Sequence, residues 1–257
     1  VKVALSAVST EGAVKNLRAE ASGKSFEQLA EAARTDWNNE LDHFEIEGTP
    51  DQKAMFYTSL YHTMINPSVY MDVDGSYRGL DHNIHQAKGF TNYTIFSLWD
   101  TYRTLNPLFT VIKPDMVGDM INSYLGIYDQ QGKLPIWPLV GGETECMPGY
   151  SAIPVIADAY LKGLSGFDAE RAMNAMLVSS TYPKQKGVPY VMELGYIPCD
   201  KLHEATSVAM EYAVGDWGIA QMAKKMGKDS VYNEYLKRGK YYTQYFDKDI
   251  NYRNNFF

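Results

Sequence analysis

The sequence predicts a mainly α-helical domain built from helical hairpins, arranged either as an open α-solenoid or as a closed toroid. Apolar residues recur at helical spacing through most of the 257 residues, and one short stretch alternates as a strand does. No fixed repeat period of roughly 30 to 45 residues is visible, which counts against a tandem-repeat solenoid. Segments 66–90 and 184–203 are long, aromatic and polar, as expected of loops that build a site on a rigid scaffold.

The N-terminal region begins with the alternating stretch and continues into helices. Residues 1–6, "VKVALS", are predicted to form a strand, and "STEGAVKNLRAE" is predicted to be a connector with a short helix. A helix is expected over residues 25–41, where Ser25 and Gln28 have the spacing of a capping box, and another over 54–64.

Further helices are predicted over residues 96–105, 114–128, 150–163, 168–179, 204–226 and 230–246. The helix over 204–226 is the most informative, because two of its faces are poor in charge. One face carries Val208, Tyr212, Gly215, Ile219, Met222 and Met226, and the other Ala209, Ala213, Ala220 and Ala223. A helix that is apolar on two sides is predicted to lie between layers of the fold.

Composition narrows the class of protein. The net charge is −7, with acids and bases interspersed, so the basic footprint of a nucleic-acid binder is missing. No apolar run reaches the roughly 20 residues that span a bilayer, and no signal peptide is visible. Cys146 and Cys199 are too few for a disulfide framework or a metal knuckle; free thiols or a single pair both fit.

The first candidate site is "SLWDTYR", residues 97–103, which places Trp99, Asp100 and Arg103 in an otherwise apolar stretch. The apolar neighbours predict that Asp100 is buried or nearly buried, and a charge in such surroundings must be paired or hydrogen-bonded. In one interpretation the segment is a sugar platform, with the Trp99 ring stacking on C–H groups and Asp100 accepting bonds from hydroxyls. In the other, Asp100 and Arg103 form an internal ion pair three residues apart at the start of a helix.

The second candidate is the loop "LPIWPLVGGETECMPGYSA", in which Glu143 and Glu145 are two residues apart. These carboxylates fit acid–base work or cation binding, and equally a solvated loop. Elsewhere, "MDVDGSY" resembles the start of a calcium loop but lacks its twelfth-position glutamate, so a β-turn is predicted. "NYT" at Asn92 matches a glycosylation sequon by pattern alone.

Read together, several long motifs resemble consecutive signatures of the glycoside hydrolase family 92 α-mannosidases. They are "FYTSLYHTMINPSVYMDVDGSYRG", "YTIFSLWDTYRTLNPL", "LPIWPLVGGETECMPGYSAIPVIADAYLKGLSGFD" and "GYIP" followed by "SVAMEYAVGDWGIAQMAKKMGK". They occur in the family's order and cover roughly residues 2 to 247. Gly215 departs from the pattern, which has an aspartate there.

The resemblance implies a fold and its domains. Residues 1–24 would be the end of an N-terminal β-sandwich domain, with a remnant strand and a linker. Residues 25–257 would be the N-terminal half of an (α/α)6 toroid, the catalytic domain, with the remaining parts of the parent chain as partners.

The resemblance also implies a calcium-dependent, inverting, exo-acting α-mannosidase that releases terminal mannose from glycans, in bacterial glycan degradation. Trp99 and Asp100 would hold the mannose, with Glu143 and Arg103 as further substrate-binding candidates. The protein would be secreted, periplasmic or surface-anchored. Calcium would contact the mannose hydroxyls and help distort the ring, with its ligands mostly outside this segment.

The family's motifs for the general acid, the general base and most calcium ligands do not occur in this sequence. We therefore expect the catalytic pair beyond Phe257, no metal ligand within the segment, and no activity from it alone. Two alternatives remain at this stage: a non-catalytic helical module that binds glycan or scaffolds a partner, and a toroid glycosidase for another sugar.

Overall fold

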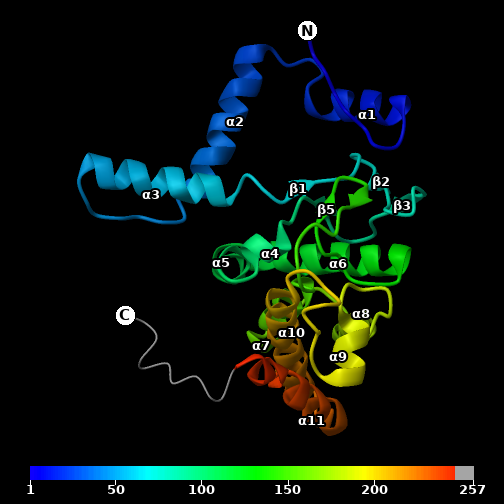
Figure 1. Cartoon of the computed structure of the whole chain (residues 1–257). Coiled ribbons are helices and arrows are strands. Elements are labelled where there is room, and N and C mark those ends of the chain that lie inside the picture. The colour runs from blue at the N-terminus through cyan, green and yellow to red at the C-terminus, as the bar shows by residue number, and fades with distance from the viewer. Residues whose placement is uncertain (247–257) are drawn as a thin grey trace.

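The computed structural model describes residues 1–246, and this part of the chain is mainly helical (Figure 1). Its α-helices are α1 (Thr10–Glu20), α2 (Phe26–Leu41), α3 (Pro50–Thr63), α4 (Leu98–Thr101), α5 (Leu105–Ile112), α6 (Pro114–Gln131), α7 (Ala152–Leu161), α8 (Ala169–Ser180), α9 (Val188–Leu194), α10 (Ala205–Lys225) and α11 (Asp229–Arg238), followed by the 3-10 helix η1 (Tyr241–Tyr245). The predicted mainly α fold class is confirmed, and none of the described helices is long and apolar enough to cross a membrane.

The strands form three small antiparallel pairs. They are β1 (Ser68–Val69) with β4 (Tyr93–Thr94), β2 (Ser76–Arg78) with β3 (Ile84–Gln86), and β5 (Pro138–Leu139) with β6 (Gly142–Glu143). The β2–β3 register places Tyr77 opposite His85. These pairs fold the predicted loop 66–90 and the "GGETE" loop into compact turns.

The predicted strand over residues 1–6 is wrong for the described chain, where no strand forms there. A strand needs a neighbouring ladder, and here side chains bond to the backbone carbonyls instead. Asn16 of α1 donates to the carbonyl of Leu5 at 2.9 Å, and Arg78 donates to that of Ala7 at 2.8 Å.

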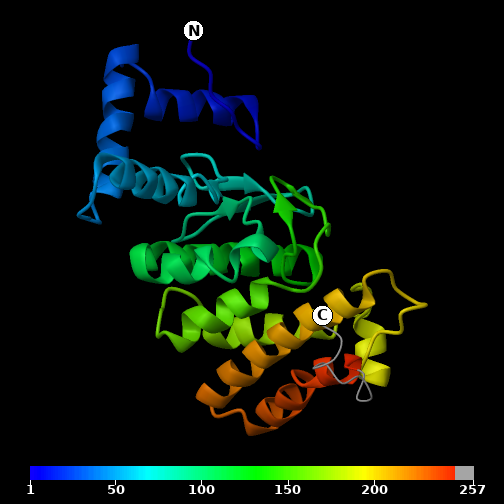
Figure 2. The ribbon, with the colours of Figure 1, turned by 60° about the vertical axis from the view of Figure 1, so that its left-hand side comes forward.

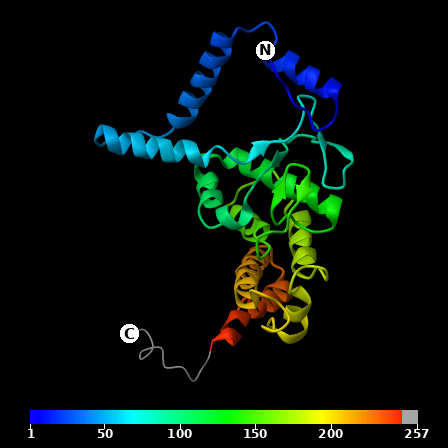
Figure 3. The ribbon, with the colours of Figure 1, turned by 45° about the horizontal axis from the view of Figure 1, so that its top comes forward.

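The N-terminal helices project from the rest of the molecule. Figures 1 and 3 show α2 and α3 extending to one side, and α2 has no buried residue. Both helices start as their sequences dictate: Ser25 and Gln28 form the predicted capping box, and Thr49 and Gln52 form a second. Capping within the first turn therefore determines where these two helices begin, and packing against the rest of the molecule contributes little to them.

The core lies among α6, α7, α8, α10 and α11, with α10 packed against both α7 and α11 (Figure 2). The predicted position of this helix between layers is confirmed, because Val208 and Ile219 on one face and Ala220 and Ala223 on another are all fully buried. The presence of glycine at position 215 has a steric explanation, because a Cβ there would lie 2.3 Å from the ring of Tyr150. Any side chain at this position would displace that ring.

The structure differs from three of the predicted segments, and each difference has a physical reason. The helix expected over 96–105 is split into α4 and α5, because Pro107 lacks an N–H and fits a helix only in its first turn. The segment 184–203 contains α9, which follows Gly187 at φ 81° and has proline in its first turn. The helix expected over 230–246 ends at Arg238 and continues, after Gly239, as η1.

Candidate functional site

The first candidate segment is held in an unusual backbone conformation. Ile95 and Ser97 both have positive φ, 60° and 47°, although neither is a glycine. Phe96 and Leu98 are buried in the core and anchor the segment. Non-glycine residues in this region of φ/ψ cost free energy and concentrate at functional sites. The strained turn thereby fixes the start of α4 and the side chains that follow it.

Trp99, Asp100 and Arg103 form a surface that we call the α4 wall. Trp99 is half-buried, and its Nε1 is buried with no hydrogen-bond partner among the described residues, so the indole offers its ring and not its N–H. Asp100 is exposed, and the expectation that it is nearly buried is wrong for this structure. Its carboxylate is reached by the Nε1 of Trp137, 3.5 Å from Oδ2. Most of its acceptor capacity faces solvent.

Arg103 does not pair with Asp100, so the internal ion-pair interpretation is wrong. Its guanidinium pairs with Glu211 of α10, and it also donates to the backbone carbonyl of Trp99 at 3.2 Å. The guanidinium carbon lies 5.1 Å from the centre of the Trp99 ring and 4.5 Å from that of Tyr102. A cation at this range over an aromatic face is attracted to the ring. Arg103 thus closes the wall on one side.

Glu211 was not predicted as a site residue. Its carboxylate accepts from Arg103 on Oε1 and from the Tyr102 hydroxyl, 2.7 Å away, on Oε2. Burial, together with this carboxylate, raises the pKa of Tyr102 well above its ordinary value. Glu211 is one of two acids in α10, and sequence spacing does not identify a partner 108 positions away.

Glu143 anchors the second loop beside the wall. It accepts three backbone N–H groups, from Ile136 at 2.9 Å, Trp137 at 2.8 Å and Glu145 at 3.0 Å. Because both of its oxygens are occupied, its role in this structure is to hold the loop that carries Trp137 to Asp100. Glu145 pairs instead with the buried Lys133, so the two acids do not face one another as a catalytic pair.

The remaining sequence candidates have structural explanations. Asp72 accepts from Ser6 at 2.7 Å and from Asn16 at 2.8 Å, which docks α1, and the N–H of Gly75 bonds to its carbonyl to close the predicted β-turn. Asn92 is buried and donates to the carbonyl of Tyr70, so it is not available as a glycosylation acceptor in this fold. Cys146 and Cys199 are both exposed and free.

A calcium site was tested against the residues present. Calcium takes six to eight oxygen ligands, several of them carboxylates. Across residues 1–246, no three His, Cys, Asp or Glu side chains come together in a way that would hold a metal ion. The described residues therefore do not make a calcium cage, and we derive no chemical step through the ion from them.

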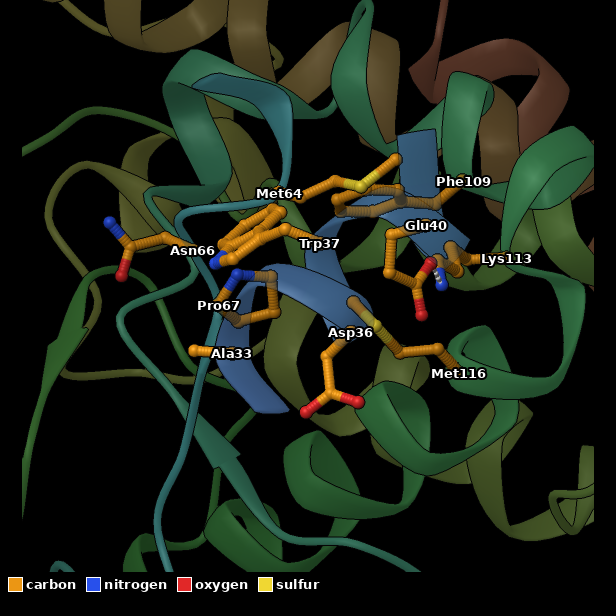
Figure 4. Close-up of a pocket in the computed structure, with 10 residues that line it drawn as sticks. All are labelled: Ala33, Asp36, Trp37, Glu40, Met64, Asn66, Pro67, Phe109, Lys113 and Met116. Carbon is orange, nitrogen blue, oxygen red and sulfur yellow. Dashed lines mark hydrogen bonds and ion pairs between the residues drawn. The ribbon is translucent and has the colours of Figure 1, made fainter. Parts of the chain in front are cut away.

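A separate cavity of about 330 Å³ lies where α2 meets α5 and α6 (Figure 4). Its lining is largely apolar, including Trp37, Met64, Phe109 and Met116, and the Glu40–Lys113 ion pair lies at one side. None of its lining residues belongs to the α4 wall or to the loop of Glu143. It lies between the projecting helix α2 and the helices α5 and α6.

These observations define a helical scaffold that carries an aromatic and acidic surface, and comparison with known proteins identifies the family. The sequence matches the model "Glycosyl hydrolase family 92 catalytic domain" over residues 12–256. The chain therefore belongs to glycosyl hydrolase family 92, and the resemblance to that family predicted from its motifs is confirmed. A search among curated proteins found no match.

Three solved structures of two enzymes illustrate the likeness. The family GH92 α-mannosidase BT3965 from Bacteroides thetaiotaomicron is 43% identical, with a TM-score of 0.92 over 94% of this chain and 33% of its own. A second structure of that enzyme, in complex with mannoimidazole, matches equally well. The inverting mannosidase BT2199 from Bacteroides thetaiotaomicron VPI-5482 is 31% identical, with a TM-score of 0.86 over 93% of this chain and 34% of its own. The chain spans about a third of the length of these relatives.

Proposed function

We propose that the protein containing this chain is an exo-acting α-mannosidase that inverts configuration, depends on calcium and releases terminal mannose from glycans. The observation that carries the proposal is 43% identity to an α-mannosidase over 94% of the chain. Inversion is supported by the printed description of the second relative as an inverting mannosidase. Calcium dependence and a secreted, periplasmic or surface-anchored location rest on the family resemblance.

The α4 wall would supply part of the pocket for the terminal mannose. A sugar presents C–H groups on its faces and hydroxyls around its edge, and it binds best to a flat apolar ring beside a hydrogen-bond acceptor. Trp99 offers such a ring, with its N–H turned away into the protein. Asp100 offers an exposed carboxylate whose one partner within residues 1–246 is the Trp137 indole at 3.5 Å. Hydroxyl groups of a sugar would complete that carboxylate's hydrogen bonds.

The catalytic step is assigned to no residue of this chain. An inverting glycosidase needs a carboxylic acid and a carboxylate about 6.5–9.5 Å apart, so that a water molecule fits between the base and the sugar. Glu143 is occupied by three backbone N–H groups and Glu145 by Lys133, which leaves neither placed for that work. We propose that the acid, the base and the calcium ligands come from the rest of the protein.

The test is release of mannose from a simple α-mannoside by the natural full-length protein and by the 257-residue chain, with and without a calcium chelator. We expect activity from the full-length protein alone, and its loss with the chelator. Activity in neither would favour the binding or scaffolding module. Activity in the 257-residue chain would place the catalytic carboxylates within it, and Glu143 would be the first residue to replace.

A further inference from the structure

We infer that Glu211 is a positioning residue of the mannose pocket, which holds Arg103 against Trp99 and so fixes the α4 wall. The inference rests on the proposed function and adds to it a residue that does not belong to the wall. Glu211 acts through Arg103 and is not itself assigned a contact with the sugar.

The first argument is that Arg103 has no other strong anchor in the part of the chain that the structure describes. Its side chain is 46% exposed, and its second bond runs at 3.2 Å to the carbonyl of Trp99 in the short helix α4, which ends just before Arg103. An exposed arginine has many rotamers, and it stays over one ring only where a partner selects that orientation. Glu211, whose side chain is 13% exposed, is that partner.

The second argument is that Glu211 stands on a rigid support. Its neighbour Tyr212 stacks on Tyr150 with 4.5 Å between ring centres, and the Tyr150 hydroxyl donates to Asp216 at 2.6 Å. Gly149, at φ 85°, lets the chain before α7 pass close to Glu211, since a Cβ there would lie 2.8 Å from the Glu211 Cβ. The carboxylate is therefore held by the core, whereas the four-residue helix α4 by itself is a weak scaffold.

The third argument is that both carboxylate oxygens serve the wall segment. One accepts from Arg103 and the other from the Tyr102 hydroxyl, so a single residue of α10 fixes two neighbours of Trp99 and Asp100. Because different substitutions remove these two bonds, an experiment can distinguish the role of the Tyr102 bond from that of the Arg103 ion pair. Loss of the Tyr102 bond leaves the ion pair in place, whereas loss of the charge on Glu211 does not.

The experiment measures the dissociation constant of mannoimidazole and the values of KM and kcat in the natural full-length protein. We expect Glu211→Gln to weaken mannoimidazole binding about tenfold and to raise KM more than it lowers kcat, because the wall binds the sugar and does not transfer the proton. Asp129→Asn, which breaks the exposed Arg171–Asp129 pair, is the matched control and should leave binding unchanged.

A double-mutant cycle separates positioning from a general structural effect. If Glu211 acts through Arg103, the double variant Glu211→Gln/Arg103→Met binds no more weakly than Arg103→Met alone. Additive losses, or wild-type binding by Glu211→Gln, would overturn the inference. If Glu211→Gln does not fold, Arg103→Met decides, because Arg103 is the residue through which Glu211 acts: a loss of about tenfold supports the inference, and near-wild-type binding overturns it. Failure of the wild-type protein to bind mannoimidazole would instead remove the proposed function, and this inference with it.

Discussion

Two clusters in this chain are built from the same parts and differ in their surroundings. The buried triad is Asp216, Arg238 and Tyr150, and the wall triad is Glu211, Arg103 and Tyr102. In each, an arginine pairs with a carboxylate and a tyrosine hydroxyl donates to the same carboxylate. Arg103 lies 4.5 Å from the centre of the Tyr102 ring, and Arg238 lies 4.5 Å from that of Tyr235, a tyrosine outside the triad.

Burial gives the two triads different properties. The side chains of Asp216 and Arg238 are 1% and 5% exposed and form two bonds of 3.0 Å, so neither charge has an alternative partner in water. Burial raises the pKa of Asp216 to about 6, against the lowering by Arg238 and Tyr150. The wall triad is more exposed to solvent. Breaking it therefore costs less free energy of folding than breaking the buried triad, while its contacts still orient the side chains of the wall. The same chemistry thus specifies packing in one place and shapes a site in the other.

The largest effect is expected from breaking the buried triad. Arg238→Leu leaves Asp216 buried without its ion-pair partner, which should lower the free energy of unfolding by about 3–5 kcal/mol. Arg171→Leu, at an exposed pair, should cost no more than about 1 kcal/mol. Chemical denaturation of both variants checks the comparison. The double variant Asp216→Leu/Arg238→Leu should recover stability relative to Arg238→Leu; a further loss would show that the charges stabilise the core.

At the wall, the expected loss is in binding and not in folding. Asp100→Ala in the full-length protein should weaken mannose binding at least about a hundredfold, since two or more hydroxyl bonds to an ionised acceptor are lost. Its effect on stability should stay within about 0.5 kcal/mol, because Asp100 is exposed and has one weak partner. Calorimetric titration and thermal unfolding measure the two quantities, with Asp200→Ala as an exposed control. Unfolding of the Asp100 variant would contradict its placement on the wall.

A smaller, local effect is expected in the loop that carries Trp137. Glu143→Gln turns an amide toward backbone donors, which should cost about 1–3 kcal/mol. Hydrogen exchange of the amides of Ile136, Trp137 and Glu145 should become faster, while exchange in α10 stays unchanged. Glu193→Gln, at an exposed position of α9, is the control. Unchanged exchange at all three amides would remove Glu143 as the anchor of the loop.

The smallest effect is expected at a fully exposed pair. Hydrogen bonds from Lys15 and Ser76 lower the pKa of Asp74 from 3.8 to about 2. Because the folded value is the lower one, the pair contributes stability above pH 4 that is lost as the pH falls from about 4 to about 2. Titration by NMR should give this pKa, and Lys15→Met should return it toward 3.8 while Lys53→Met does not. A value near 3.8 in the unmodified protein would show that the pair does not persist in solution.

The sequence predicted the elements whose causes are local. The capping box at Ser25 and Gln28 sets the start of α2, and the two apolar faces of α10 place that helix between layers. The β-turn at Asp72 followed from turn chemistry in the same way. The wall residues Trp99 and Asp100 were found because an acid beside a tryptophan in an apolar stretch calls for an explanation.

Other features depended on contacts between distant parts of the chain. The expected strand over 1–6 is absent because a strand depends on a partner ladder, which no local pattern reports. Arg103 pairs with Glu211 and not with Asp100, although Asp100 is three residues away and Glu211 is 108, because the packing of α10 brings the distant carboxylate to the guanidinium.

The sequence by itself determined most of the helices, the cap at Ser25, the family and the two residues of the wall that face the sugar in our proposal. Only the tertiary structure decided that Asp100 is exposed, that Glu143 is an anchor of its loop, and that one arginine pair is buried while its counterpart is wet. The physical reason is that capping and periodicity act within a few residues along the chain. Burial and the pairing of charges are properties of the whole packed molecule.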